Sequence, residues 1–338
     1  MTVLRIGHIE LYATEREELV DYFVSALDFA DMARARSSRA ESSLLQRGDV
    51  RLIVTEGDVA AEFLERHGDG VADIAFICDD VAATRDRALA AGARAVGENA
   101  VAAFGSVRHS LLPESTRYAP ASLPWTPAAR AARRADAERS PHIRALDHIA
   151  VVLDAGDLHE RVEHYIEAFG FERYSSEFIE VGNQAMDSIV ARNLAATATF
   201  TFLEPVTNRE AGQLDAFLDR NAGPGVQHLA FLVDEIVPAV RDFRDRGVDF
   251  LTTPGAYYDA LSDRLREMSV EIADLRDTNV LADRDEWGYL LQLFTRSPHS
   301  RNTLFYELIQ RRGARGFGSA NIRALYEAVE REDRIVAE

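Results

Sequence analysis

Two nearly identical stretches decide the fold: Gly68–Phe76 reads GDGVADIAF, and Gly223–Phe231 reads GPGVQHLAF. They differ most clearly at one position, where the first stretch has Asp73 and the second has His228. Apolar residues flank both positions, as expected for strands with a buried face. A segment that returns far along the same chain indicates an internal duplication.

The repeat extends well beyond this pair. IGHIELYA at Ile6–Ala13 matches LDHIAVVL at Leu146–Leu153, which places His8 opposite His148. An amphipathic helical stretch follows each of these segments, and the two stretches quoted first are each followed by a helix and another strand. The sequence therefore predicts an internally duplicated α+β chain built from paired βαβββ modules. Residues 113–145, biased toward Pro, Ala and Arg, are predicted to form a linker between residues 1–112 and 146–338.

Composition excludes several classes of function. The 338-residue chain has a formal net charge of -18 and a pI near 5.0, which argues against nucleic acid or an anionic membrane as a partner. Its single cysteine, Cys78, rules out an intrachain disulfide and a multi-cysteine metal site, and its apolar context DIAFIC predicts a buried core thiol. With no signal peptide or membrane-length apolar run, we expect a cytoplasmic protein.

Three residues form a candidate metal site. His148 and His228 lie in matched strands of the second half, and Glu307 lies in the otherwise apolar segment TLFYELIQ. A buried carboxylate needs a partner or a metal, and strand alternation puts Phe305 and Glu307 on one face and turns Tyr306 away. Two imidazoles and one carboxylate leave half of an octahedral shell open, which suits non-haem Fe(II) oxygen chemistry. The ligand types alone also allow zinc hydrolysis.

The other histidines stand in polar or helical contexts and are interpreted as surface groups: His67, His109, His142, His159, His164 and His299. The chain closes with the amphipathic segment SANIRALYEAVERED, after the Gly-rich turn GARGFGS. This turn could hinge the terminal helix as a lid.

Around the candidate metal ligands and in the closing segment, the sequence resembles the vicinal-oxygen-chelate superfamily. Within it, the resemblance is to the α-keto acid dioxygenases typified by 4-hydroxyphenylpyruvate dioxygenase and 4-hydroxymandelate synthase. The similarity covers nearly the whole chain and is densest from Leu146 onward. Its segments are LDHIAVVL, GPGVQHLAF, TPGAYYDAL, NVLADRDEWGYLLQLFT, TLFYELIQRRG and GFGSANIRALYEAVE. The resemblance implies two open barrels of the glyoxalase/dioxygenase type, with the metal ligands His148, His228 and Glu307 in the second. The first barrel would be a degenerate twin, and Asp73 would mark the copy without iron.

The resemblance also implies the chemistry. The cofactor would be Fe(II), and the partners would be O2 and a small α-keto acid that supplies its own oxidisable carboxylate, with a homodimer as a further expectation. The family makes homogentisate or 4-hydroxymandelate from 4-hydroxyphenylpyruvate. Where homogentisate-forming members usually read Pro-x-Asn-Glu-Pro, this chain has TFLEP at Thr201–Pro205, and Ile322 stands where they have Phe. Both departures are similar to the mandelate-forming members.

Family pocket positions map onto a further set of residues, which we expect to contact the substrate: Ser188, Thr201, Gln213, Gln227, Gln292, Phe294, Phe305, Phe317, Asn321 and Ile322. The alternatives within the class are homogentisate formation and hydroxylation of a related keto acid. Outside it, the alternatives are a metal-free protein that binds a small ligand and a Zn or Mn isomerase or hydrolase. Activity without O2 would identify the last of these.

Overall fold

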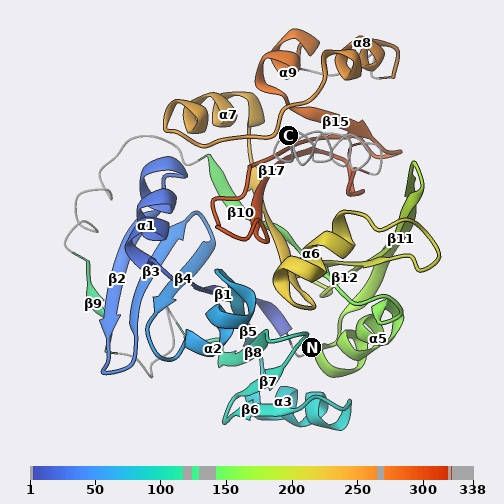
Figure 1. Ribbon diagram of the computed structural model, residues 1–338. Helices are drawn as coiled ribbons and strands as arrows, with labels where there is room; N and C mark the ends of the chain where they lie inside the picture. The colour runs from blue at the N-terminus through green and yellow to red at the C-terminus, as the bar shows by residue number, and fades with distance from the viewer. Residues whose placement is uncertain (1–2, 117–123, 129–141, 265–269, 319–320, 322–338) are drawn as a thin grey trace.

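Two mixed β-sheets with flanking helices build the molecule (Figure 1). The computed structural model describes residues 3–116, 124–128, 142–264, 270–318 and 321. Most of the expected linker, the terminal helix after Asn321 and Ile322 therefore lie outside the described residues. No helix within the described ranges is long and apolar enough to span a bilayer.

The first sheet contains nine strands in the order β6-β7-β8-β5-β1-β4-β3-β2-β9. Its strands are β1 (Val3–Tyr12), β2 (Ala30–Arg36), β3 (Glu41–Arg47), β4 (Val50–Glu56), β5 (Gly70–Cys78), β6 (Ala95–Gly97), β7 (Ala100–Ala102), β8 (Arg108–Pro113) and β9 (Thr126–Pro127). The helices of this half are α1 (Arg16–Asp21), continued by the π-helix η1 (Tyr22–Ala26), α2 (Ala61–His67) and α3 (Val81–Ala90).

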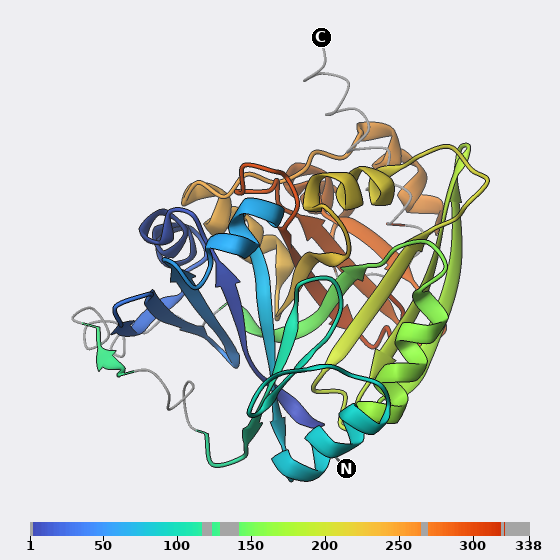
Figure 2. The same cartoon turned by 60° about the horizontal axis from the view of Figure 1, so that its bottom comes forward.

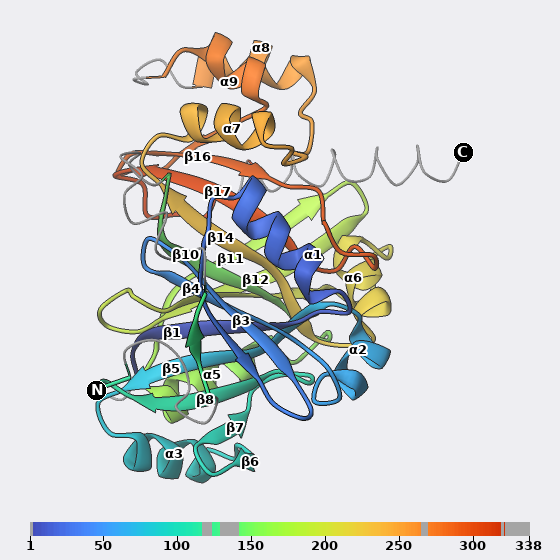
Figure 3. The ribbon, with the colours of Figure 1, turned by 90° about the vertical axis from the view of Figure 1, so that its left-hand side faces the viewer.

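The second sheet contains eight strands in the order β11-β12-β13-β10-β14-β17-β16-β15. Its strands are β10 (Ile143–Val152), β11 (Glu172–Val181), β12 (Gln184–Arg192), β13 (Thr199–Pro205), β14 (Gly225–Val233), β15 (Leu281–Arg284), β16 (Tyr289–Phe294) and β17 (Phe305–Arg312). The helices are α5 (Leu158–Phe169), α6 (Gln213–Asn221), α7 (Ile236–Asp245), α8 (Gly255–Arg264) and α9 (Ile272–Thr278). Figure 2 shows this sheet curling as a half-barrel, and Figure 3 shows α7, α8 and α9 grouped at one end.

The two sheets repeat one topology, which confirms the duplicated α+β fold. Every strand of the second sheet has a counterpart in the first. The order β15-β16-β17-β14-β10-β13-β12-β11 corresponds, strand by strand, to β6-β7-β8-β5-β1-β4-β3-β2. In both sheets the parallel pairs fall at the same places, β1 with β4 and β5 with β8, then β10 with β13 and β14 with β17. Even a bulge is repeated, between Ile6 and His8 in β1 and between Leu146 and His148 in β10.

One hydrophobic core joins the two halves, because each sheet turns an apolar face toward the other. Alternation along β13 sends Phe200 and Phe202 into this core, where their rings stack 5.6 Å apart and contact Tyr165 of α5. Tyr306 of β17 also points into the core, where it stacks on Phe231 at 5.9 Å. As alternation predicts, Tyr306 is turned away from the neighbouring Glu307 site.

Three histidines interpreted as surface groups are in fact buried: His67, His109 and His299. Each has a polar partner that is distant in sequence. His109 lies 2.8 Å from the Ile74 carbonyl oxygen and 2.6 Å from the Tyr165 hydroxyl, and His67 lies 2.8 Å from the Ser106 hydroxyl. His299 Nδ1 lies 3.7 Å from Asp69 Oδ2, and its Nε2 lies 3.0 Å from the Tyr306 hydroxyl. Tertiary partners satisfy these rings, and local sequence context does not reveal such partners.

The buried His109 makes stability depend on pH. Burial lowers the pKa of His109 from 6.5 to about 4. The unfolded chain therefore takes up the proton near pH 6.5, whereas the folded chain takes it up only near pH 4. The contribution of neutral His109 to the unfolding free energy is therefore complete above pH 6.5 and is lost as the pH falls to 4. The total loss is about 3 kcal/mol.

Chemical denaturation of metal-free protein at pH 7 and pH 5 checks this expectation. Between these pH values, wild type should lose about 2 kcal/mol more unfolding free energy than His109→Gln does. The exposed His159 supplies the control, since His159→Gln should behave like wild type. Equal losses in wild type and His109→Gln would contradict the role of His109.

Candidate metal centre

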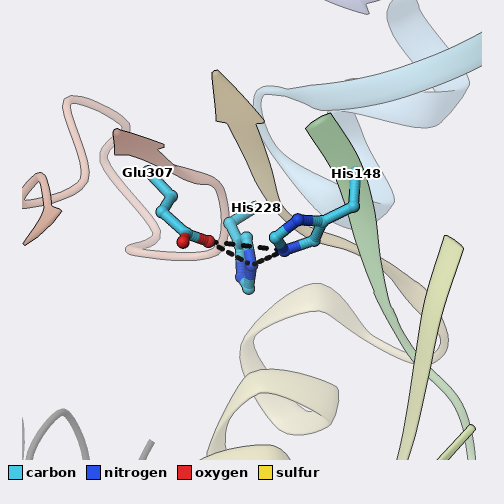
Figure 4. A group of neighbouring side chains, drawn as sticks. All are labelled: His148, His228 and Glu307. Atoms are coloured by element: carbon cyan, nitrogen blue, oxygen red, sulfur yellow. Dashed lines mark hydrogen bonds and ion pairs between the residues drawn. The ribbon is translucent and has the colours of Figure 1, made fainter. Parts of the chain in front are cut away.

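The register of three neighbouring strands brings the predicted ligands together. Strand β14 lies between β10 and β17, and Ala230 of β14 is opposite both His148 of β10 and Glu307 of β17. His228 lies two residues before Ala230 on the same face of β14. The three side chains therefore point into one space inside the second sheet (Figure 4).

The geometry fits a single metal ion. His148 Nε2 lies 3.3 Å from His228 Nε2, and Glu307 Oε2 lies 3.4 Å and 3.3 Å from these two nitrogens. The centre of this triangle is about 1.9 Å from each atom, which is close to ordinary metal–ligand distances of about 2.1 Å. Within the described part of the chain, these residues form a buried group with metal-ligand spacing.

The charges of the site favour a cation. Burial alone would raise the pKa of Glu307, but the nearby charge of His148 and hydrogen bonds from both imidazoles lower this pKa to about 2. Glu307 is 1% exposed and lies on an internal strand, which excludes a position on a solvent-facing edge. A buried carboxylate that stays ionised needs positive charge beside it, and a bound divalent metal would supply it.

A chain of amides orients Glu307. Gln292 Nε2 donates to Glu307 Oε1 over 2.8 Å, which leaves Oε2 facing the two imidazoles. Asn321 Nδ2 donates to Gln292 Oε1 over 2.9 Å, and the Tyr257 hydroxyl lies 3.0 Å from Asn321 Oδ1. These contacts fix which carboxylate oxygen is available to a metal.

A cavity opens beside the three candidate ligands. Its walls are His148, Met186, Thr201, Leu203, Leu214, Gln227, His228, Gln292, Phe294, Glu307 and Phe317. Of the expected substrate contacts, Thr201, Gln227, Gln292, Phe294 and Phe317 are in these walls. The Thr201 hydroxyl is buried and has no hydrogen-bond partner among the described residues, so it can bind a polar group in the cavity.

Other expected contacts lie elsewhere. Ser188 shares the inner face of β12 with Met186, but its hydroxyl donates to the Glu177 carbonyl oxygen over 3.0 Å instead of lining the cavity. Gln213 begins α6, and the wall is formed by Leu214 beside it. Phe305 stacks on the His228 ring, with centroids 5.1 Å apart, and Asn321 acts through Gln292.

Sequence reasoning missed three apolar wall residues: Met186, Leu203 and Leu214. For Leu203 a signal existed, because Thr201 and Leu203 are two apart on one strand and must share a face. The position of Met186 in the cavity wall depends on the pairing of β12 with β13, in which Met186 is opposite Pro205. That pairing is not readable from the sequence alone.

The first half contains the same site in a different form. Asp73 is paired with Arg108 in the first sheet, and its counterpart His228 is paired with Phe305 in the second. Two residues further along these partner strands, Ser110 is therefore the counterpart of Glu307. Arg108 Nε donates to Asp73 Oδ2 over 2.7 Å, and its Nη2 donates to Glu10 Oε2 over 2.9 Å. The counterpart of His228 in the first half is thus a carboxylate held by a guanidinium that also binds a second carboxylate.

Comparisons with known proteins agree with this geometry. Residues 1–106 match the family model described as hydroxyphenylpyruvate dioxygenase, N-terminal, and residues 147–265 match the glyoxalase/bleomycin resistance protein/dioxygenase superfamily model. A 4-hydroxyphenylpyruvate dioxygenase of Yarrowia lipolytica is 30% identical over 96% of this chain and 91% of its own length. The chain belongs to the 4-hydroxyphenylpyruvate dioxygenase family.

Two further relatives extend the comparison. A 4-hydroxyphenylpyruvate dioxygenase of Dictyostelium discoideum is 28% identical over 96% of this chain and 97% of its own length. The solved structure of a triple mutant of 4-hydroxymandelate synthase from Streptomyces coelicolor is 48% identical, covers 98% of this chain and 99% of its own, and has a TM-score of 0.89. The expected vicinal-oxygen-chelate fold and dioxygenase class of enzyme are confirmed.

Proposed function

We propose that this member of the 4-hydroxyphenylpyruvate dioxygenase family binds Fe(II) at His148, His228 and Glu307. In this proposal it converts 4-hydroxyphenylpyruvate and O2 to 4-hydroxymandelate and CO2. The observation that carries the metal assignment is the triangle of ligand atoms, with sides of 3.3 to 3.4 Å, beside a mainly apolar cavity. Iron would supply open coordination positions for the keto acid and for O2.

The chain's own side chains would position the substrate. Leu203, Leu214 and Phe294 form apolar walls that can hold an aromatic ring and exclude water. The Thr201 hydroxyl and the Gln227 amide are the polar groups of the cavity that are not metal ligands or directly bonded to Glu307. We infer that they fix the orientation of the bound keto acid, which decides the carbon that is oxidised.

Two observations favour 4-hydroxymandelate over homogentisate as the product. The 4-hydroxymandelate synthase comparison reaches 48% identity, against 30% and 28% for the two 4-hydroxyphenylpyruvate dioxygenases. The wall segment Thr201–Pro205 also places Leu203 where homogentisate-forming members usually have Asn, which makes this wall less polar. The role of Ile322 in this choice stays a prediction, as does the cytoplasmic location of the protein.

Product analysis tests the proposal. Metal-free protein is loaded with Fe(II) without oxygen, mixed with 4-hydroxyphenylpyruvate and then exposed to O2. We expect O2-dependent release of CO2 and one organic product that coelutes with 4-hydroxymandelate. The two candidate products are isomers, so chromatography against both standards is needed in addition to mass. Homogentisate as the main product would overturn the regiochemistry but not the class.

The second candidate function is binding of a small ligand without catalysis. In that case the iron-loaded protein would bind the keto acid, with no consumption of O2. Turnover that proceeds equally well without O2 would instead indicate an isomerase or hydrolase, and it would overturn the proposal altogether.

A further inference from the structure

Asp147 reaches back to the neighbouring metal ligand. The bulge in β10 falls between Leu146 and His148, and such an irregularity redirects side chains. Asp147 Oδ1 lies 2.8 Å from His148 Nδ1. The other imidazole has a weaker partner, since His228 Nδ1 lies 3.3 Å from the neutral Gln227 Oε1. The two histidine ligands are therefore supported differently.

Arg311 fixes Asp147 in turn, from a position 164 residues away. Its Nε donates to Asp147 Oδ2 over 2.7 Å and its Nη2 donates to Asp147 Oδ1 over 2.8 Å. This forked pair is mostly buried, with exposed side-chain fractions of 19% for Arg311 and 10% for Asp147. Bidentate pairs of this type hold a carboxylate in one orientation.

The same guanidinium also holds the wall of the cavity. Arg311 Nη1 donates to the Gly316 carbonyl oxygen over 2.6 Å. The ring of the next residue, Phe317, has its centroid 4.9 Å from Arg311 Cζ and 5.1 Å from the His148 ring. Since Phe317 lines the cavity, Arg311 contacts both the support of a metal ligand and a wall of the proposed substrate site.

The first half offers an internal comparison. The shared register places Gly7 at the position of Asp147, and extending the match of β8 with β17 by one residue places Glu114 at the position of Arg311. His8 thus keeps the imidazole but has neither the carboxylate nor the guanidinium. The copy that retains three ligands is the copy that has this support.

We propose that Asp147 and Arg311 are positioning residues of the metal centre, an inference that rests on the proposed function. An ionised carboxylate only accepts hydrogen bonds, so Asp147 keeps a hydrogen on His148 Nδ1 and leaves Nε2 to face the metal. Arg311 orients Asp147 and ties the turn at Gly316 and Phe317 to the same ligand. The metal site and the cavity wall are thereby set by one guanidinium.

Cobalt(II) titration of the metal-free protein tests this role without depending on turnover. Asp147→Asn preserves volume but removes the charge, and we expect metal binding about 10- to 100-fold weaker than in wild type, as for other partners of ligand histidines. Arg311→Met should weaken binding similarly. Arg311→Lys should weaken it less, because the ammonium keeps the positive charge, but it should still weaken it, because an ammonium cannot make the forked pair. Arg144→Met is the control and should bind like wild type. Arg144 lies on β10 as Asp147 does, but its ion pair with Asp234 is exposed.

Steady-state kinetics separate the two contacts of Arg311. Because Asp147→Asn leaves the donor to Gly316 in place, the KM for the keto acid should rise in Arg311→Met more than in Asp147→Asn, at saturating metal. A purely structural role would lower the unfolding free energy of both variants and leave cobalt affinity unchanged, which would overturn the inference. Failure of the wild type itself to bind cobalt would instead contradict the proposed metal site.

Discussion

Glu307→Gln is expected to lose more than roughly 100-fold of its turnover while keeping its fold, since it removes a ligand itself and not an outer partner. The substitution preserves the volume of a side chain that is 1% exposed. The new amide can still accept from Gln292 Nε2, which lies 2.8 Å from the present carboxylate oxygen. The substitution does, however, remove the negative charge that makes the group of His148, His228 and Glu307 suitable for binding a cation.

Three measurements define this result: the O2-dependent rate, the metal dissociation constant and the unfolding free energy of the metal-free protein. We expect the O2-dependent rate and the metal affinity to change strongly. The unfolding free energy should fall by about 2 to 3 kcal/mol, because the buried carboxylate loses its ion pair with His148 although no cavity is created. The exposed Glu62 provides a matched control, since Glu62→Gln should leave all three unchanged. A Glu307→Gln protein with the wild-type rate would refute the ligand assignment.

Asp73→Asn, at the position matched to His228, is expected to have the opposite outcome. Asp73 is 1% exposed and accepts from Arg108 Nε over 2.7 Å and from the Ser110 amide over 3.0 Å. Loss of the charge leaves a guanidinium with less compensation, which should lower the unfolding free energy by about 2 to 3 kcal/mol. The lower part of this range applies if solvent screens Arg108, whose side chain is 38% exposed.

Turnover by the folded Asp73→Asn protein should stay at the wild-type level, because the first half holds an ion-pair network where the second holds its ligands. Chemical denaturation gives the stability, and rates are measured well below the melting transition, again with Glu62→Gln as the control. A folded Asp73→Asn protein with normal stability and no turnover would show that the first half contributes to catalysis directly. Together the two substitutions separate the copies by function.

The duplication explains why so much of the fold and the ligand cluster could be predicted. A repeated strand pattern fixes the topology twice, and the contrast between Asp73 and His228 indicates which copy has changed. The inward position of Glu307 followed from alternation with Phe305 and Tyr306, because a strand has only two faces.

The partners of the ligands could not be predicted, since they come from distant segments. Arg311 and Asp147 are joined by a fold in which β10 and β17 both flank β14. Neither local periodicity nor charge pattern indicates this pairing. The burial of His109 has the same origin, because Tyr165, its partner, lies in the other half of the chain.

A crystal structure of protein grown anaerobically with Fe(II), with anomalous scattering measured at the iron edge, tests the central claim most directly. We predict one strong peak about 2.0 to 2.3 Å from His148 Nε2, His228 Nε2 and a Glu307 carboxylate oxygen. An iron peak beside His8 and Asp73, or no peak at the three ligands in iron-saturated crystals, would contradict the account.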